Sequence, residues 1–491
     1  MSTETHVSTS NETHLNLIDG AWAPSAGANT FPNLNPADTR DTVGRFQAST
    51  HEDARRAIEA AQAAFDGWKR TPIGRRARIL NDAAQHLETR CEQIALDLSR
   101  EQGKPLALAR DEVIRSAQTL RFYAVEGQTF TGETFPNDDP DQTVYTLREP
   151  LGVVSVISPW NFPVSIPARK IAPALITGNT VVFKPSSDAP LSGVHLAKAF
   201  ADAGIPKGVL NMVTGAAADV GAALTASPEI RAITFTGSTA AGRHIHRTAG
   251  LCTRVQLELG GKNPLIVMED ADLDLAVDLT VKGGYSLSGQ ACTGTSRVIV
   301  MNAVREEFTR RLLTKVRMLK IGSGTTPGMD LGPLASARQM ETVLSYMAIG
   351  RAEATLLHGG ERVSGPDHDH GYYVAPTVFG DVTMKMRIAR EEIFGPVIAL
   401  IEASDYADAI AKANDTEYGL SAAICTRDAR YMHRFARDIE SGTVKINRTT
   451  TGNLVNAPFG GIKQSSTSTF RESGRAGLEF YTQIKTVYQG C

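Results

Sequence analysis

The chain has 491 residues, of which 42% are hydrophobic and 21% are charged, and its 51 basic and 53 acidic residues leave a net charge of −2. At about 100–200 residues per domain, this length predicts two or three domains with substantial cores. The near-neutral charge gives no reason to expect nucleic acid or an anionic membrane as a partner.

The cysteines and the amino terminus narrow the class further. Five cysteines are scattered along the chain, and no two stand at C-x-x-C spacing. This usage argues against a disulfide scaffold and against a thiolate metal site, and it favours a reducing cytoplasm. Residues 1–14 are polar and lack the apolar core of a signal peptide, so we expect a disordered tail there. No apolar run approaches the roughly 20 residues of a membrane helix.

After this tail the sequence is first helical and then hairpin-like. From Thr50 to Arg100 the pattern is helical, and Thr50 can cap a helix with Asp53 three residues on. Around Gly127–Pro150, the segment QTVYTLREP has the β-branched and aromatic residues of a hairpin.

From Leu151 short β-branched runs alternate with alanine-rich helical runs. The helical runs include Ile166–Ile176 and Leu191–Ala203. The expected strands are Val153–Ile157, Thr180–Lys184, Val209–Val213, Ala232–Thr236 and Arg254–Leu259. Such alternation indicates a parallel, doubly wound α/β sheet, which binds nucleotides at the carboxyl ends of its strands.

A second alternating series runs from about Asn263 to Gly452. Its expected elements are the strands Asn263–Met268, Arg297–Met301 and Val397–Ile401 and the helix Val304–Leu319. At the carboxyl end, the alternation in Leu478–Tyr488 predicts a closing strand that pairs with the hairpin near Gly127–Pro150. An exposed edge there would favour pairing with another subunit, so we expect a dimer or a tetramer.

Two residues are candidates for covalent and acid–base chemistry. Cys292 lies in SGQACTG, where small and polar neighbours favour an accessible thiolate that attacks a carbonyl carbon, although most cysteines are small buried hydrophobes. Glu258 lies in LELGGK, after an apolar strand. It is either a solvent-facing strand end or a general base whose pKa is raised by partial desolvation, and its position alone does not decide.

Three strand-end turns supply further candidates. Asn161 lies between the prolines of PWNFP and could stabilise an oxyanion, although a rigid structural turn is the simpler interpretation. Gly237 lies in FTGSTAAG, where a helix follows a strand and free N–H groups attract phosphate, although the spacing is not G-x-G-x-x-G. Lys184 in FKPSS could bind ribose hydroxyls or phosphate, although most lysines are solvated.

Taken in order, PWNFP, KP, FTGS, ELGG, GQxC, EEIFGP and PFGG resemble the aldehyde dehydrogenase superfamily, over about Asn16 to Gln489. The 34 residues from Glu258 to Cys292 are also similar to the family's spacing. In appearance the chain is nearest to the α-ketoglutarate-semialdehyde and succinate-semialdehyde dehydrogenases.

The resemblance implies a fold with a Rossmann-like cofactor domain, an α/β catalytic domain and a small β bridging element for oligomerisation. The expected division is 15–126 with 150–258 for NAD(P) binding, 259–457 for catalysis, and 127–149 with 470–491 for bridging. The expected assembly is a cytoplasmic homodimer or homotetramer.

The resemblance also implies catalytic roles. Cys292 would attack the aldehyde and form first a thiohemiacetal and then a thioester. Asn161 and the backbone N–H of Cys292 would hold the oxyanion, and Glu258 would activate the hydrolytic water. Lys170 and Glu472 match positions that relay protons from Glu258 in some members.

The implied cofactor is NAD or NADP, without a metal. The residues that would contact it are Trp160, Lys184, Ser187, Gly237, Ser238, Glu392 and Phe394. Lys184 would bind the adenosine ribose, Ser238 the pyrophosphate and Glu392 the nicotinamide ribose. Many NAD-preferring members carry Glu at the position of Ser187, and because Ser does not repel a 2′-phosphate, we expect NADP to be accepted.

Two arginines predict an anionic small-molecule substrate. Arg169 resembles the arginine that binds the distal carboxylate in succinate-semialdehyde dehydrogenases, but their second arginine is replaced here by Ser286. Arg448, in INRTTTG, is another cation at a loop that commonly lines the substrate tunnel. Together they favour a semialdehyde with a negative charge, although each could form a structural salt bridge instead.

Other functions stay open at this point. They are a broad-range aldehyde dehydrogenase, an oxidiser of sulfonated or phosphorylated aldehydes, an acylating dehydrogenase that uses coenzyme A, and a catalytically silent structural homologue. The presence of Glu258 argues against the acylating reaction, and intact Cys292, Glu258 and Asn161 argue against a silent homologue.

Overall fold

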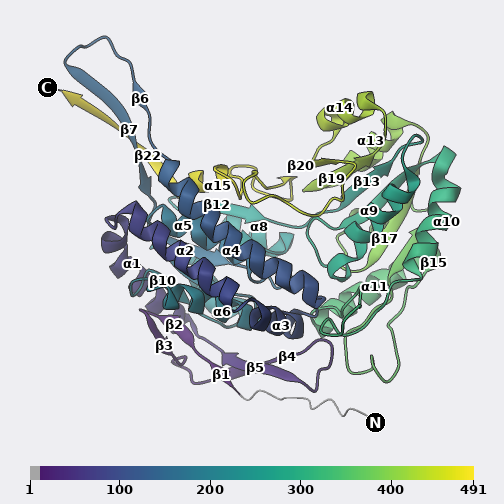
Figure 1. Ribbon diagram of the computed structural model, residues 1–491, viewed down its shortest axis with the longest axis horizontal. Coiled ribbons are helices and arrows are strands. Elements are labelled where there is room, and N and C mark those ends of the chain that lie inside the picture. Colours follow the sequence, from purple (N-terminus) through teal and green to yellow (C-terminus); the bar gives the residue numbers. More distant parts are fainter. Residues whose placement is uncertain (1–11, 491) are drawn as a thin grey trace.

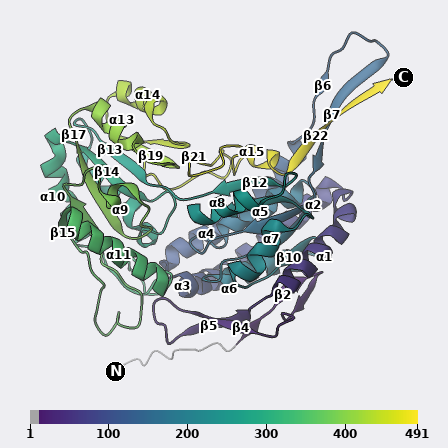
Figure 2. The same cartoon turned by 180° about the vertical axis from the view of Figure 1, so that it is seen from behind.

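Residues 12–490 of the chain are described by a computed structural model, shown from two sides in Figures 1 and 2. The first half of the chain builds one seven-stranded sheet and the second half builds another. A narrow three-stranded arm projects from one end of the molecule (Figure 1). Within the described residues, no helix is long and apolar enough to cross a membrane.

The first sheet has the strand order β12-β11-β8-β9-β10-β2-β3. Its strands are β2 (Asn16–Ile18), β3 (Ala21–Ala23), β8 (Val153–Ile157), β9 (Thr180–Lys184), β10 (Leu210–Met212), β11 (Ile230–Thr236) and β12 (Arg254–Glu258). The five strands from β12 to β10 run parallel, and β2 and β3 add an antiparallel edge. The doubly wound sheet expected from the sequence is therefore confirmed, and each predicted strand ends within two residues of the observed one.

Helices cover both faces of this sheet because its strands are apolar on both sides. Val154 and Val156 belong to the core on the α5 and α6 side, whereas Val153 and Val182 belong to the core on the α1 and α8 side. Such two-sided apolar strands are typical of a parallel sheet. The helices of this half are α1 (His51–Lys69), α2 (Ile73–Thr89), α3 (Cys91–Gln102), α4 (Leu106–Thr129), α5 (Ser165–Ile176), α6 (Pro190–Asp202), α7 (Ala222–Ala226) and α8 (Thr239–Thr248).

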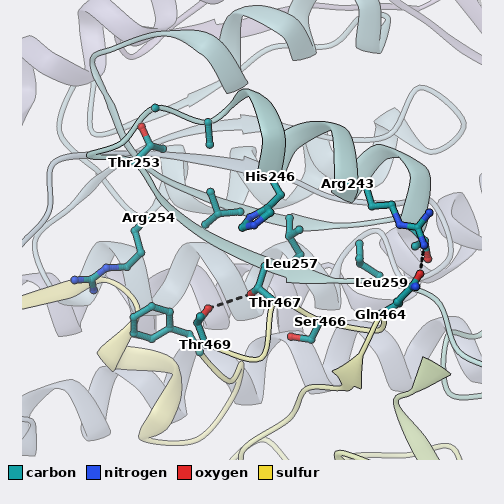
Figure 3. Close-up of a pocket in the computed structure, with 15 residues that line it drawn as sticks. Arg243, His246, Thr253, Arg254, Leu257, Leu259, Gln464, Ser466, Thr467 and Thr469 are labelled. Atoms are coloured by element: carbon teal, nitrogen blue, oxygen red, sulfur yellow. Dashed lines mark hydrogen bonds between the residues drawn. The ribbon is translucent and has the colours of Figure 1, made fainter. Parts of the chain in front are cut away.

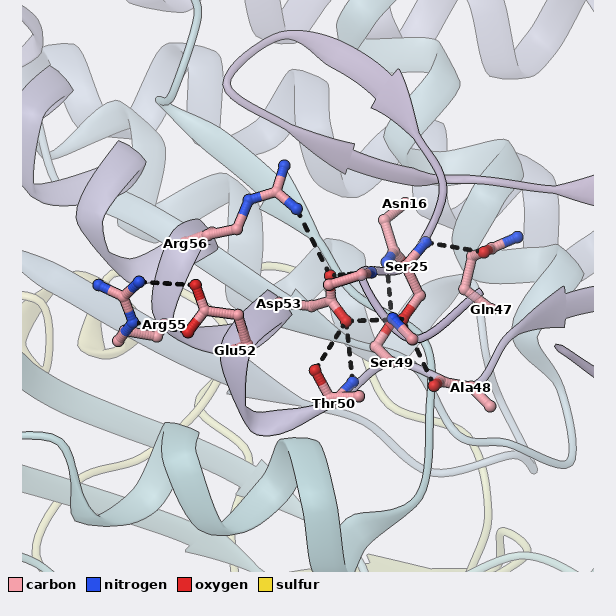
Figure 4. Close-up of polar contacts among 12 residues, drawn as sticks. Asn16, Ser25, Gln47, Ala48, Ser49, Thr50, Glu52, Asp53, Arg55 and Arg56 are labelled. Atoms are coloured by element: carbon pink, nitrogen blue, oxygen red, sulfur yellow. Dashed lines mark hydrogen bonds and ion pairs between the residues drawn. The ribbon is translucent and has the colours of Figure 1, made fainter. Parts of the chain in front are cut away.

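The start of α1 follows its capping sequence. Thr50 and Asp53 form the predicted capping box. The fully buried Asp53 also accepts hydrogen bonds from Ser25 Oγ (2.7 Å) and from the Ala26 N–H (2.9 Å) (Figure 4). Burial alone would raise the pKa of Asp53, but the hydrogen bonds lower it below its usual value. A cap of this kind stabilises a helix by about 0.5–2 kcal/mol.

The second sheet has the order β15-β16-β17-β14-β13-β19-β20 and is parallel except at β15. Its strands are β13 (Asn263–Val267), β14 (Thr295–Met301), β15 (Thr355–His358), β16 (Thr377–Gly380), β17 (Val397–Ala403), β19 (Ser421–Cys425) and β20 (Thr443–Ile446). The helices of this half are α9 (Leu273–Tyr285), α10 (Arg305–Val316), α11 (Ala337–Glu353), α12 (Arg387–Arg390), α13 (Tyr406–Asn414) and α14 (Ala429–Asp438).

The arm joins the hairpin to the carboxyl end of the chain. Strand β7 (Gln142–Pro150) pairs antiparallel with β6 (Thr134–Phe135) and, along its full length, with β22 (Thr482–Gly490). Apolar side chains on it are exposed, among them Ile484 at 60% and Tyr488 at 69%.

The hairpin and the closing strand expected near the arm begin later in the structure than the sequence suggested. Helix α4 continues to Thr129, so the segment that begins at 127 starts with helix. Residues 470–481 are not part of the arm, because a short helix, α15 (Ala476–Glu479), precedes β22. Leu478 and Phe480 are buried in the core of the first half, and this burial produced the alternation that we interpreted as a strand. The division into domains itself stays a prediction.

The amino-terminal expectation also needs a correction. Residues 1–11 lie outside the described residues, but Thr13 and His14 form a strand, β1 (Thr13–His14), instead of a disordered tail. This strand pairs with β5 (Thr42–Gln47), which also pairs with β4 (Thr30–Leu34). The His14 ring stacks on Phe46 with 4.8 Å between centroids, a contact that fixes the segment.

Candidate active site

The strand ends of the first sheet gather most of the predicted site residues. Asn161 follows β8, Lys184 ends β9, Gly237 follows β11 and Glu258 ends β12. Because these strands are parallel neighbours, their carboxyl ends lie along one edge of the sheet. Cys292 comes from the other half of the chain, three residues before β14 begins, and Asn161 is hydrogen-bonded to nearby Gln290, so the candidate site lies where the two halves meet.

The Cys292 thiol is partly buried, and its electrostatic neighbours are predicted site residues. Desolvation raises the pKa of this thiol to about 12, with Arg169 opposing the rise and Glu392 and Glu258 adding to it. The thiol is therefore protonated at neutral pH in the protein alone. A positive charge brought close to the sulfur would favour the reactive thiolate.

The loop before Cys292 is strained. Leu287, Ser288 and Gly289 have φ angles of 57°, 52° and 72°, three consecutive residues in the left-handed region. A Cβ on Gly289 would lie 2.0 Å from the carbonyl oxygen of Gly395, so only glycine fits there. This conformation was not foreseen from the sequence, which predicted only an open loop.

Two amide side chains hold the backbone on either side of Cys292. Asn161, only 3% exposed, donates from Nδ2 to the Gln290 carbonyl (3.0 Å) and accepts from the Phe162 N–H (3.1 Å). Asn263 donates to the carbonyls of Cys292 (2.8 Å) and Gly294 (2.9 Å). Since an amide has two N–H groups, Asn161 retains one for another acceptor.

Glu258 is a buried carboxyl group without a hydrogen bond. It is 2% exposed, and neither of its carboxylate oxygens has a partner among the described residues. Burial raises its pKa well above the usual value and Glu472 raises it further, while Lys170 and Arg169 oppose them. Lys170 itself forms a buried ion pair with Glu472 and donates to Thr234 Oγ1 (2.9 Å). A raised pKa makes this carboxylate a stronger base than an exposed glutamate, which suits a general base.

Residues expected at the adenosine end lie at two turns of the first sheet. Lys184 is 5% exposed, and its amine, whose pKa burial lowers to about 8, donates to the Pro185 carbonyl (3.2 Å). Ser187 donates to the Gly215 carbonyl (2.9 Å). After Gly237, Ser238 is the N-cap of α8 and accepts from the Ala241 N–H (3.3 Å). An amine with donors to spare and a helix amino terminus fit ribose hydroxyls and a pyrophosphate.

Residues expected at the nicotinamide end come from both halves, Trp160 from the first and Glu392 and Phe394 from the second. Glu392 accepts from the Gly261 N–H (2.9 Å), and burial raises its pKa to about 7. A Cβ on Gly260 would lie 2.2 Å from Oε2 of Glu392, which explains the glycine at this position. The rings of Trp160 and Phe394 meet edge to face with 5.4 Å between centroids. A carboxylate beside an aromatic pair fits a ribose with its attached base.

The two candidate substrate arginines lie in different surroundings. Arg169, on α5, lies over the Phe459 ring at 5.5 Å, and its buried Nε has no hydrogen-bond partner in the described part of the chain. Arg448 is exposed, and it is not among the main influences on the pKa of the Cys292 thiol. Within residues 12–490 neither arginine forms a salt bridge. The alternative that each arginine forms a structural salt bridge therefore has no acidic partner to support it.

Comparisons with known proteins give the same assignment as the motifs. The sequence profile of the aldehyde dehydrogenase family matches residues 22–487. The chain belongs to the aldehyde dehydrogenase family. The α-ketoglutaric semialdehyde dehydrogenase of Bacillus subtilis (strain 168) is 44% identical over 484 residues, 98% of this chain and 99% of that protein.

Solved structures agree in fold with this aldehyde dehydrogenase. An NADP-dependent enzyme from E. coli superposes with a TM-score of 0.93 at 36% identity, covering 98% of both chains. An NAD-dependent aldehyde dehydrogenase from Sinorhizobium meliloti superposes with a TM-score of 0.94 at 37% identity, covering 98% of this chain and 95% of that one. The expected fold is confirmed, and the chain is an oxidoreductase that acts on aldehydes.

The aldehyde dehydrogenase also has a cavity away from these groups. It measures about 520 Å³ and lies between α8 and residues 464–470 (Figure 3). Arg243, His246 and Arg254 line it together with apolar side chains such as Phe470. Arg254 is already bound to backbone carbonyls and Arg243 to Gln464. None of the predicted site residues lines this cavity.

Sequence reasoning missed several residues that build the site. Asn263 and the buried ion pair of Lys104 with Glu112 were not among the candidates. One signal was available for Glu112, because it is a carboxylate in the stripe of α4 that Ala109 and Val113 make apolar. Nothing local in the sequence marks Lys104 or Asn263.

Proposed function

We propose that this enzyme oxidises an anionic semialdehyde, of the α-ketoglutarate-semialdehyde type, to the carboxylate through a thioester on Cys292. The observation that carries the proposal is the buried, unpartnered Nε of Arg169, whose charge acts on the Cys292 thiol. A cation without a carboxylate partner beside the nucleophile is suited to an anionic substrate. The printed name of the Bacillus subtilis relative supports this choice.

In the first half of the reaction, Cys292 adds to the aldehyde. The sulfur–carbon bond forms while the carbonyl π pair moves to oxygen, and the thiol proton leaves to solvent because Cys292 is partly exposed. The second N–H of Asn161 donates to the resulting oxyanion; one such donor contributes about 2.7–4 kcal/mol in comparable sites. Lys184, Ser238 and Glu392 would hold NAD(P), which would supply the hydride acceptor for this step and a positive charge that favours the thiolate.

In the second half, water hydrolyses the thioester. Glu258, once deprotonated, takes a proton from the water as its oxygen bonds to the acyl carbon. The carbon–sulfur bond then breaks, the acid leaves as a carboxylate, and the sulfur is ready for another turnover. The Lys170–Glu472 pair lies behind Glu258, where it can pass that proton outward.

The substrate proposal is tested by initial rates with a panel of aldehydes. Arg169→Ala should lower kcat/KM for α-ketoglutarate semialdehyde by roughly 30-fold to several thousand-fold. This range corresponds to the loss of about 2–5 kcal/mol that follows removal of one partner of a buried charge pair. Rates with neutral aliphatic aldehydes should hardly change, and Arg169→Lys should keep part of the preference. If neutral aldehydes are preferred and Arg169→Ala leaves every rate unchanged, the enzyme is a broad-range one.

For the cofactor, we propose that NADP is accepted because Ser187 replaces a carboxylate. A like charge facing the 2′-phosphate costs several kcal/mol, so Ser187→Glu should lower kcat/KM for NADP by about tenfold or more. The matched control is Ser187→Gln, which adds the same bulk without the charge. Equal losses in both variants would mean that size, not charge, decides.

We further propose a homodimer or homotetramer, assembled through the arm. The exposed Ile484 and Tyr488 support this, because they lie on β22, the edge strand of the arm, and apolar side chains on an edge strand favour association. Ile484→Lys should reduce the molar mass measured by light scattering. An unchanged mass would exclude the arm as the interface, and the cytoplasmic location stays a prediction.

A further inference from the structure

Next to the turn that carries Asn161 lies a buried ion pair that the reaction itself does not use. Lys104 precedes α4 and Glu112 lies within it, and each side chain is 1% exposed. The Lys104 amine donates to the backbone carbonyl of Asn161 (2.7 Å) and lies over the Phe162 ring at 4.6 Å. The cation therefore contacts the backbone of the residue proposed to hold the oxyanion.

The other member of the pair contacts the same turn three residues later. Glu112 Oε1 accepts hydrogen bonds from the N–H groups of Val164 (2.9 Å) and Ser165 (3.1 Å), where α5 begins. Its second oxygen is paired with Lys104. Between them, the two side chains fix the backbone at both ends of Asn161–Ser165.

This arrangement is costly for stability alone. Two buried charges lose their hydration, and replacing a buried pair by apolar residues of similar volume is often neutral or stabilising. The surroundings on α4, such as Ala109 and Val113, are apolar and would accept such residues. Apolar side chains, however, make no directed bonds, whereas this pair makes three to one short turn.

We propose that Lys104 and Glu112 are positioning residues that act through Asn161. By fixing the turn, they keep one amide N–H on the Gln290 carbonyl and aim the other at the aldehyde oxygen. The inference rests on the oxyanion role proposed above for Asn161. It assigns no contact with substrate or cofactor to either charged residue.

A mutant cycle on the full-length enzyme tests the proposal. Lys104→Met with Glu112→Leu removes both charges, so that no unpaired charge stays buried. In the wild-type background, kcat should fall on the order of tenfold to a hundredfold, as for a displaced catalytic group. KM and the dissociation constant of NADPH, measured by its fluorescence, should stay within about twofold. In an Asn161→Ala background the same double substitution should cause no further loss of kcat.

A matched control comes from the exposed ion pair of Arg110 with Glu92, whose cation is on the same helix. Arg110→Met should leave kcat unchanged. If the Lys104→Met, Glu112→Leu variant unfolds, Lys104→Met with Glu112→Gln also removes both charges, keeps an acceptor for the turn, and is carried through the same cycle.

Two results would overturn the proposal. One is a kcat that stays within twofold of wild type in a folded variant; the other is an equal loss in both backgrounds, which indicates a general structural effect. If Asn161→Ala alone leaves kcat unchanged, the oxyanion role fails first, and the cycle identifies that failure separately.

Discussion

Two buried Lys–Glu pairs lie close to the candidate site, and they are built differently. In the pair of Lys104 and Glu112, all the charge is matched, and the remaining acceptor and donor groups bind backbone. The pair of Lys170 and Glu472 instead adjoins Glu258, a third ionisable group whose carboxylate oxygens have no hydrogen-bond partner within residues 12–490. The Lys104–Glu112 pair, in which each charge has its partner, therefore fixes the backbone of the turn. The Lys170–Glu472 pair has a third carboxyl group, that of Glu258, beside it, and this group can exchange a proton.

The third carboxyl group explains why the second environment suits a base. Burial and Glu472 favour the neutral form of Glu258, and Lys170 limits that effect. Because these influences on the pKa of Glu258 oppose one another, removing any one of them should change its pKa. The three predictions below compare substitutions of Glu258 and its neighbouring pair with substitutions of the Lys104–Glu112 pair.

The largest effect is expected for Glu258→Gln. The amide has the same shape but cannot accept the proton of water, so steady-state turnover should fall by about 10²–10⁴-fold. Hydride transfer precedes hydrolysis, so the first turnover should survive. Stopped-flow absorbance should therefore show a burst of about one NAD(P)H per active site, followed by a slow phase. A first turnover slowed as much as the steady state would assign Glu258 to an earlier step.

The next effect is on pH dependence. If Glu258 is the base proposed above, it acts when deprotonated, so kcat should fall as pH drops through its pKa. A higher pKa should then move this acid limb of the pH profile to higher pH. Lys170→Met removes an influence that lowers the pKa, and Glu472→Gln removes one that raises it. In kcat measured from pH 5 to 9, the acid limb should move to higher pH in Lys170→Met and to lower pH in Glu472→Gln. Lys104→Met with Glu112→Leu should leave it in place, and shifts of equal sign in the two Glu258 neighbours would contradict the assignment.

The sequence predicted the parts of this site that depend on local pattern. The strands before Asn161 and Lys184 are short β-branched runs, and turns with proline or glycine follow them, so their ends could be placed. The proximity of Lys170 and Glu472 to Glu258 came instead from the family resemblance. The contact of Lys104 with Asn161 joins residues 57 positions apart and leaves no periodic mark, so it could not be read from the sequence.

The left-handed run at Leu287–Gly289 was missed for a related reason. Only Gly289 in it is a residue type that signals a positive φ, and the other two are held there by contacts with distant segments such as the Gly332 carbonyl, which accepts from Ser288 (2.7 Å). Local preference therefore predicts the strands and turns of this enzyme. Strain and buried charge depend on tertiary contacts.

The smallest effect is on stability, and its sign distinguishes the unpartnered Glu258 from the paired Glu112. The pKa of Glu258 is raised in the folded state, so its contribution to stability is present below the unfolded value, near 4.5, and is lost as pH rises through the folded value. Glu258→Gln removes this loss together with an unsatisfied buried charge, and should stabilise the enzyme at pH 8 by about 1–3 kcal/mol. The gain should shrink at pH 5, as measured by urea unfolding. Glu112→Gln, the same change in the complete pair, should destabilise the fold at both pH values, because it leaves Lys104 buried without a counter-charge. If both variants destabilised the enzyme at pH 8, Glu258 would have to be a hydrogen-bonded or ion-paired carboxylate like Glu112. The difference in environment between Glu258 and Glu112 would then disappear.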